Sequence, residues 1–240
     1  MKNLLLPALV WLVGVVPALA QATEGQQERT PGPFHAITVG TGIELLLTAG
    51  PVQRVAVSAA TADLRDHILT TVSSGVLSIY YENLDDRGSY SNTKRERASK
   101  QLRVAVTTDQ LTALTAGSGA QVRATGNFTA PDFQLDVSSG ANCQASDLAV
   151  GVLVVRQSSG STVVLAGRAP RFDLRIASGS TFNGEALQTD RGQIEATNGS
   201  TVRLAVRESL LAEASSGATI RYLGSPAVTK DVSGGGSIGK

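Results

Sequence analysis

Apolar and polar side chains alternate along the second half of the chain, on both sides of a recurring Ser-Gly, Asn-Gly or Gly-Gly pair. Five residues before the glycine the side chain is apolar, and the next one is polar. The apolar position holds Leu114, Leu135, Val155, Leu174, Ile194 and Ala212. Three residues after the glycine, a second apolar position holds Val122, Cys143, Val163, Phe182, Val202, Ile220 and Ile238. A period of two residues is typical of β-strands and not of helices. The pattern therefore predicts a strand on each side of every pair.

These pairs recur at a nearly constant spacing, which indicates an internal repeat. Successive glycines are separated by 18 to 21 residues, and they are Gly119, Gly140, Gly160, Gly179, Gly199, Gly217 and Gly235. A repeat of this length is typical of a solenoid, in which one repeat alone cannot bury its apolar face. We predict a tight structural corner at each pair. Glycine there either adopts a backbone angle that other residues resist or lets neighbouring coils approach closely.

The predicted fold is all-β: a single-stranded parallel β-helix, or β-solenoid, with coils of 18 to 21 residues. In such a fold the same position of successive coils stacks at the inter-strand spacing of about 4.8 Å. Valine, isoleucine and leucine suit a core filled in this way. A helical alternative does not fit, because β-branched residues and Gly-Ser corners stand where a helix favours Ala, Leu or Glu.

The N-terminal half follows the same pattern less regularly, and we assign β coils to residues 34–112 and regular repeats to 113–240. Five segments alternate as strands do: 37–39, 43–47, 54–57, 77–81 and 102–106. Turn signals at Gly42, Gly50-Pro51 and Ser74-Gly75 separate several of them. Residues 62–69 are compatible with a single helical turn. A polar insertion over 82–101 is too long for a hairpin tip, and it is either a solvated loop or a projecting binding loop.

The first residues have the features of a secretory signal peptide. Lys2 precedes an apolar run over residues 4–16, which ends in Ala18-Leu19-Ala20. This order is the pattern of a signal peptide over residues 1–20, and the run is shorter than the roughly 20 residues of a membrane span. We predict a flexible leader over 21–33 and an exported mature chain without a transmembrane span. Its predicted location is the periplasm, or the cell surface and the extracellular space.

Composition excludes several classes of function. The 240 residues contain 21 Lys and Arg against 20 Asp and Glu, and only 4% are aromatic. A nearly neutral chain without aromatic platforms does not favour nucleic-acid binding. One cysteine and two histidines exclude a disulfide framework and multi-cysteine metal sites, so we predict no metal and no cofactor. Cys143 lies in an apolar column, which favours a buried small side chain over a reactive thiol.

Several motifs together resemble a bacterial family, the auto-transporter adhesin, head GIN domain family. They are Phe34-x-x-Ile37-x-Val39-x-x-Gly42-Ile43, Leu69-Thr70-Thr71-Val72-x-x-Gly75-x-Leu77-x-Ile79, the serial corners, and Ser233-Gly234-Gly235-Gly236-Ser237-Ile238. The resemblance covers residues 34–239. It implies an exported β-solenoid, similar to a right-handed parallel β-helix, and it supplies no catalytic residues.

No set of residues has the spacing of an active site, so we predict no catalytic residues. Glu195 and Glu213 lie one coil apart in the same outward column, where paired carboxylates would act on polysaccharides. Arg175 stands one coil below Glu195, which favours a solvated ladder of charges. Thr162, Thr181, Thr201 and Thr219 also form a column. Charged neighbours there disfavour an ice-binding face, so hydrogen bonds between coils are the simpler interpretation.

The candidate binding residues are arginines of two outward columns. Arg123, Arg203 and Arg221 occupy one, and Arg156 and Arg175 the other. They suit acidic sugars or the carboxylates of a partner, and ordinary solubilising charge is the alternative. The last coil has no obvious polar cap. Its open end is therefore a candidate surface for forming a homo-oligomer or for docking to an envelope partner.

Three functions follow from the sequence, in order of preference. The first is an exported, non-enzymatic binding or adhesion-like protein of the bacterial cell envelope, with a glycan or an envelope or host surface protein as its partner. The alternative is a periplasmic structural or signalling-associated module. The third is a polysaccharide-active β-helix enzyme.

Overall fold

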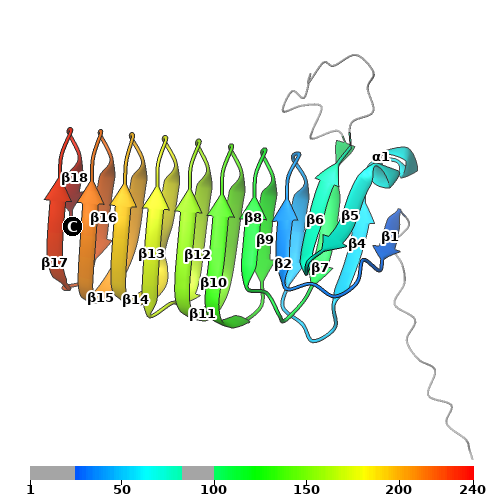
Figure 1. The fold of residues 1–240 in the computed structure, drawn as a ribbon, viewed down its shortest axis with the longest axis horizontal. Coiled ribbons are helices and arrows are strands. Elements are labelled where there is room, and N and C mark those ends of the chain that lie inside the picture. Colours follow the sequence, from blue (N-terminus) through cyan, green and yellow to red (C-terminus); the bar gives the residue numbers. More distant parts are fainter. Residues whose placement is uncertain (1–24, 83–99) are drawn as a thin grey trace, which may run out of the picture.

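The computed structural model describes residues 25–82 and 100–240, and strands stack along one long axis through most of this length (Figure 1). The described part is nearly all β, with 64% of residues in strands and 3% in helix. The stacked parallel coils confirm the predicted β-solenoid. The predicted signal peptide and most of the 82–101 insertion lie outside the described residues.

Each coil has one strand that leads into a corner and one that leaves it. The strands that lead into corners form sheet A: β6 Val76–Tyr81, β2 Ala36–Val39, β8 Ala113–Ala116, β10 Phe128–Val137, β13 Arg171–Ile176, β17 Ala227–Val232 and the second halves of β11, β14 and β15. The strands that leave corners form sheet B: β7 Arg103–Thr107, β3 Glu44–Thr48, β9 Gln121–Thr125, β12 Thr162–Arg168, β16 Thr219–Leu223, β18 Ser237–Gly239 and the first halves of β11, β14 and β15. Neighbouring coils pair in parallel in both sheets.

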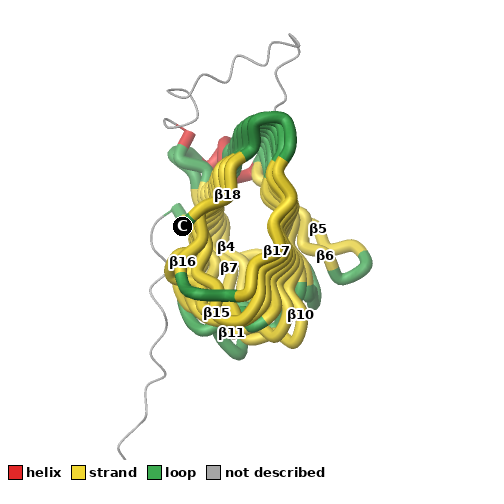
Figure 2. The backbone as a smooth tube through the Cα atoms, turned by 90° about the vertical axis from the view of Figure 1, so that its left-hand side faces the viewer, coloured by secondary structure: helices red, strands yellow, loops and turns green. Residues whose placement is uncertain are grey.

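Three long strands connect one coil to the next without a break. They are β11 Asn142–Gln157, β14 Thr181–Ala196 and β15 Thr201–Ala214. Each begins in sheet B, bends across the base of the coil opposite the corners, and ends in sheet A (Figure 2). The register shifts where the strands bend, between Ala145 and Leu148 and between Gly184 and Thr189. Such bulges let a continuous strand turn sharply.

Each Ser-Gly, Asn-Gly or Gly-Gly corner from Ser118-Gly119 onward is a two-residue turn with both residues in the left-handed region. At Ser118-Gly119 the φ angles are +48° and +74°, and the seven glycines predicted at corners all have φ between +68° and +78°. The Ala120 N–H donates to Gly117 O at 3.0 Å and closes the turn, while the Gly119 N–H donates to Ser139 O of the next coil at 3.0 Å. A Cβ would meet nothing within 4 Å at the six corner glycines from Gly140 to Gly235. The backbone angle, and not close approach, is therefore what requires glycine there.

The N-terminal end departs from simple winding. The β2–β3 coil is the first in sequence, yet it lies between two later coils. Strands β6 and β7 pair with it on the side of the N-terminal end, and β8 and β9 pair with it on the other side. The strand β5, Ile68–Ser73, pairs antiparallel with β6, and the strand β4, Arg54–Ser58, pairs antiparallel with β7. The alternation predicts the strand over 54–57, which is β4, but it predicts neither β5 nor the antiparallel pairing. Ser74-Gly75 joins β5 to β6 in a two-residue hairpin with φ of +50° and +75°, which is the backbone of a tight hairpin turn.

Two smaller segments cover the same end. The helix α1, Ala62–Asp66, lies within the segment predicted as one helical turn, and Thr61 caps it by accepting from the Leu64 N–H at 3.2 Å. The strand β1, Gln26–Arg29, pairs antiparallel with β4. The polar composition predicts a flexible leader over 21–33, but backbone pairing with β4 orders residues 26–29 instead.

The core is a continuous stack of apolar side chains between the two sheets. Phe172 and Phe182 stack with ring centroids 5.1 Å apart, and Phe182 is fully buried. Cys143 lies between Val122 and Val163 in the same column, and 2% of it is exposed. Burial raises the pKa of its thiol to about 12, so the thiolate form needed by a nucleophile is scarce at neutral pH. Cys143 therefore acts as a buried small side chain.

The last coil has a polar cap that was not apparent from the sequence. Lys230 lies in register with Ala212, in the column of inward side chains. Its Nζ donates to Ile238 O at 3.2 Å and lies 5.3 Å from the centre of the Tyr222 ring. Lys230 thus reaches across the end of the core from sheet A to sheet B.

Candidate binding surfaces

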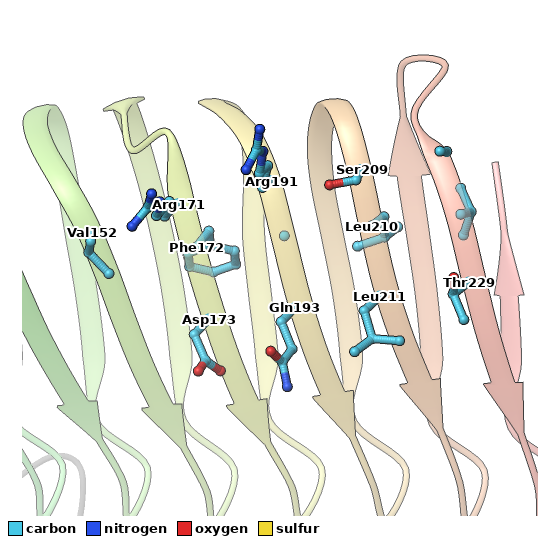
Figure 3. A pocket seen from close by; sticks show the side chains of 13 residues that line it. Val152, Arg171, Phe172, Asp173, Arg191, Gln193, Ser209, Leu210, Leu211 and Thr229 are labelled. Atoms are coloured by element: carbon cyan, nitrogen blue, oxygen red, sulfur yellow. The ribbon is translucent and has the colours of Figure 1, made fainter.

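A shallow hollow of about 490 Å³ crosses the outer face of sheet A, and we call it the long hollow (Figure 3). Its outward side chains include Val152, Arg171, Asp173, Arg191, Gln193, Ser209, Leu211, Ala227 and Thr229. They come from five strands, β11, β13, β14, β15 and β17. Four strand spacings correspond to roughly 19 Å. The long hollow is therefore elongated along the solenoid axis.

Polar groups at one end of the long hollow carry opposite charges. Arg171 and Arg191 are neighbours in register, while Asp173 and Gln193 follow two residues further along the same strands (Figure 3). Arg191 Nε lies 3.1 Å from Glu208 Oε2, and Arg171 makes no ion pair within the described residues. The surface thus offers guanidinium donors beside carboxylate and amide acceptors, a combination that can bind hydroxyl-bearing and charged ligands.

The long hollow was not predicted from the sequence. Its side chains lie eight and six residues before the corner glycines, whereas the candidate arginines lie four residues before or after them. Extending the same alternation by two more outward positions would have found Arg171 and Arg191. The depression itself depends on side-chain volumes and has no sequence signal.

Two predicted binding residues, Arg156 and Arg175, line a second hollow of about 360 Å³ at the corner end of sheet A. They face each other in register. Arg156 Nη1 lies 3.6 Å from Asp136 Oδ1, and Arg175 Nε lies 3.6 Å from Glu195 Oε2. Each guanidinium therefore has a carboxylate neighbour on its other side. Glu195 and Glu213 are in register as expected, and the ion pair with Arg175 favours a charge ladder over a catalytic pair.

The other three predicted arginines lie on the outer face of sheet B. Arg123 Nη1 lies 3.9 Å from Glu44 Oε1, and Glu44 also accepts from Arg103 Nε at 2.7 Å. Arg203 and Arg221 are register neighbours on β15 and β16, and β18 is the next strand beyond them in sheet B. Neither makes an ion pair within residues 25–82 and 100–240. The structure therefore does not bring the five arginines into one site: they belong to three separate places.

No metal centre is formed by the residues that the structure describes. Nowhere among them do three or more His, Cys, Asp or Glu side chains gather in a way that would hold a metal ion. Within the same ranges, no helix is long and apolar enough to span a membrane.

The fold and these open surfaces define a class of protein, a β-solenoid with broad side-chain faces. Residues 33–226 match the family described as "Putative auto-transporter adhesin, head GIN domain". The chain belongs to this family, as the motifs indicated. The sequence has no significant match among curated proteins.

Solved structures of bacterial proteins share the fold. A "putative adhesin" from Bacteroides fragilis NCTC 9343 matches with a TM-score of 0.75 and 17% identity, over 89% of this chain and 95% of the other. A "putative adhesin" from Parabacteroides merdae ATCC 43184 matches with a TM-score of 0.69 and 17% identity, over 90% and 95%. A "putative lipid binding protein" from Parabacteroides distasonis ATCC 8503 matches with a TM-score of 0.69 and 16% identity, over 90% and 95%. At these identities the likeness concerns the fold alone.

Proposed function

We propose that this protein is an exported, non-enzymatic, adhesion-like protein of the bacterial cell envelope, which binds an extended ligand along the long hollow. The observation that carries the proposal is the shape of this surface: it is open, it spans five strands, and it runs along the solenoid axis. Membership of an adhesin family agrees with a binding role.

Recognition on this surface depends on side chains. The backbone N–H and C=O groups of sheet A are used in the parallel ladders between coils, so a peptide cannot add to the middle of the sheet as a further strand. Arg171, Asp173 and Gln193 supply polar contacts, and Leu211, which is 37% exposed, supplies an apolar one. A glycan or a partner's surface meets these requirements.

Two other functions fit the surface less well. Lipid binding, the role attributed to one structural neighbour, needs an apolar cavity, whereas the core here is filled by buried side chains. Polysaccharide cleavage by Glu195 and Glu213 is disfavoured by the ion pair between Glu195 and Arg175. Cleavage of acidic glycans that is lost in Glu195→Gln would contradict a non-enzymatic role.

Location is tested on intact cells of the bacterium that makes the protein. Antibody labelling or protease cleavage before outer-membrane permeabilisation, or protein in the culture medium, is the expected result. Labelling that requires permeabilisation would overturn the adhesion role and support the alternative, a periplasmic structural or signalling-associated module.

The long hollow is tested by filling it. Leu211→Arg places a long charged side chain in its floor, and we expect attachment of the purified protein to its target surface to fall at least tenfold. Val52→Arg, at a 57% exposed position in the loop between β3 and β4, makes a comparable change outside the hollow and is the control. Circular dichroism checks that both variants fold. Equal attachment of Leu211→Arg and the unchanged protein would exclude the long hollow as the binding surface.

A further inference from the structure

Arg203 and Arg221 are like charges placed face to face without compensation. They are direct register neighbours on β15 and β16, and both are exposed on the outer face of sheet B. Like charges opposite each other destabilise a sheet. The in-register pair Arg156 and Arg175 on sheet A is flanked by Asp136 and Glu195. No carboxylate pairs with Arg203 or Arg221 within the described residues, so the arrangement does not serve stability.

Hydroxyl and amide groups lie on the corner side of this pair, whereas Ala205 and Leu223 follow it on the other side. Thr201 and Thr219 are register neighbours two residues before the arginines, and Thr181 and Asn183 continue the same two columns on β14. Glu185, two residues after Asn183 on β14, has its N–H bonded to Asn183 Oδ1 and forms no ion pair with either arginine. The local surface is therefore basic and rich in hydrogen-bonding groups.

We infer that Arg203 and Arg221, with Thr201 and Thr219, bind the carboxylates of an acidic polysaccharide. Guanidinium groups bind carboxylates with charge-assisted, often bidentate hydrogen bonds, and two of them at one strand spacing suit a single carboxylate. The ladders of sheet B occupy its backbone groups, so an acidic peptide gains no main-chain hydrogen bonds here. A polymer with both hydroxyls and carboxylates uses the threonines as well as the arginines. This site is separate from the long hollow and does not depend on it.

The probe is an oligomer of galacturonic acid, and the matched ligand is its methyl ester, which keeps the sugars and removes the charge. Calorimetry with the folded protein should detect the acid and not the ester, with affinity that falls as salt rises. Arg203→Gln/Arg221→Gln should weaken binding at least tenfold. Arg156→Gln/Arg175→Gln removes the same charge from an in-register pair on sheet A and should change binding less than twofold.

Three results would overturn this site: no binding of the acid, equal loss in both double variants, or binding of polyglutamate as tight as that of the oligouronate. The last would assign the surface to an acidic protein. Because the measurement uses no cells and leaves Leu211 intact, its failure is distinct from failure of the adhesion role.

The geometry also points to a second device: Lys230 prevents another copy of the chain from stacking on the last coil. The inward column that Lys230 joins otherwise holds Leu135, Val155, Leu174, Ile194 and Ala212, all buried. Within the described residues, β17 and β18 have no strand partner on their outer edges. Val232 is 49% exposed there. A coil added at this end would have to bury the Lys230 ammonium, and inward charges are a known means of protecting a sheet edge.

Replacing Lys230 should therefore promote end-to-end association. For Lys230→Leu we expect dimers, in sedimentation or light scattering, at a protein concentration at least tenfold below that of the unchanged chain. Lys230→Met, which keeps the length that covers Tyr222, should behave in the same way. Thr229→Leu adds an apolar side chain to the outward face of the same strand and should not associate. Monomeric Lys230→Leu and Lys230→Met, or equal association of Thr229→Leu, would overturn the protective role.

Discussion

Gly167→Ala is expected to lower the free energy of unfolding by about 3 kcal/mol or more. Gly167 has φ of +122° and lies at the base of its coil, next to Leu148 of the preceding one. A Cβ there would overlap Leu148 O and lie 2.5 Å from Leu148 N. Both atoms belong to the backbone of a paired strand and cannot move without breaking the ladder. Urea and thermal denaturation measure the loss, with a decrease of roughly 10 °C in Tm.

Gly160→Ala is the matched control, seven residues earlier in the same coil. Its φ of +69° disfavours alanine by about 1 to 2 kcal/mol, but a Cβ there meets nothing within 4 Å. We expect a loss of about 1 kcal/mol, because alanine also reduces the entropy of the unfolded chain. If both variants lost the same stability, close approach at the base would not be the constraint we describe.

This contrast shows how far a glycine pattern can be read from sequence. The corner glycines were found because they recur with the repeat, and the structure shows that their backbone angle is the reason. Gly167 and Gly224 are tighter positions, where a Cβ would overlap Leu148 O and Val206 O. The repeat does not predict them, because the base of the coil varies in length and these glycines do not align between repeats.

Ser74-Gly75 marks a second limit. It is a Ser-Gly pair like those of the corners, with φ angles of +50° and +75° close to those of Ser118-Gly119. The strands beside it pair with each other as an antiparallel hairpin, whereas the strands beside a corner pair with neighbouring coils. Local residues determine the turn, but the partners of the strands depend on the rest of the chain. The order of coils at the N-terminal end is therefore not predictable from the pairs alone.

For the candidate arginines, too, the local sequence predicts one property, and the packing of distant residues determines another. Their columns place the side chains outward, as Arg156 and Arg203 illustrate. Whether an arginine is available to a ligand depends on the carboxylates of other coils and loops. Asp136 lies beside Arg156, whereas no carboxylate lies within ion-pair distance of Arg203 in the described residues. The sequence pattern thus predicts which side chains face outward. In the site proposed above, the arginines that bind a ligand are those without a carboxylate neighbour.

Phe182→Ala is expected to lower the free energy of unfolding by about 3 to 5 kcal/mol. Phe182 is fully buried, and its ring stacks on Phe172 across a centroid distance of 5.1 Å. Two residues later Gly184 provides the space for this ring, because a Cβ on Gly184 would lie 2.8 Å from Phe182 Cε1 and 3.0 Å from Leu204 Cδ1. Gly184→Ala alone should also destabilise the protein, by overpacking.

The two changes should compensate each other in part. Without the phenyl ring, the methyl group added at position 184 and the Leu204 side chain can occupy the vacated volume. The free energy of unfolding of Phe182→Ala/Gly184→Ala should therefore fall by at least about 1 kcal/mol less than the sum of the two single losses. Gly192→Ala is the control, because the three atoms nearest to a Cβ there belong to Leu210, Leu204 and Val206, whereas a Cβ on Gly184 meets the Phe182 ring first. Combined with Phe182→Ala, it should show a smaller coupling. Urea denaturation of the six proteins in the two cycles gives both coupling energies. A strictly additive Phe182→Ala/Gly184→Ala would mean that Gly184 is not needed to make room for the ring, and its glycine would require another explanation.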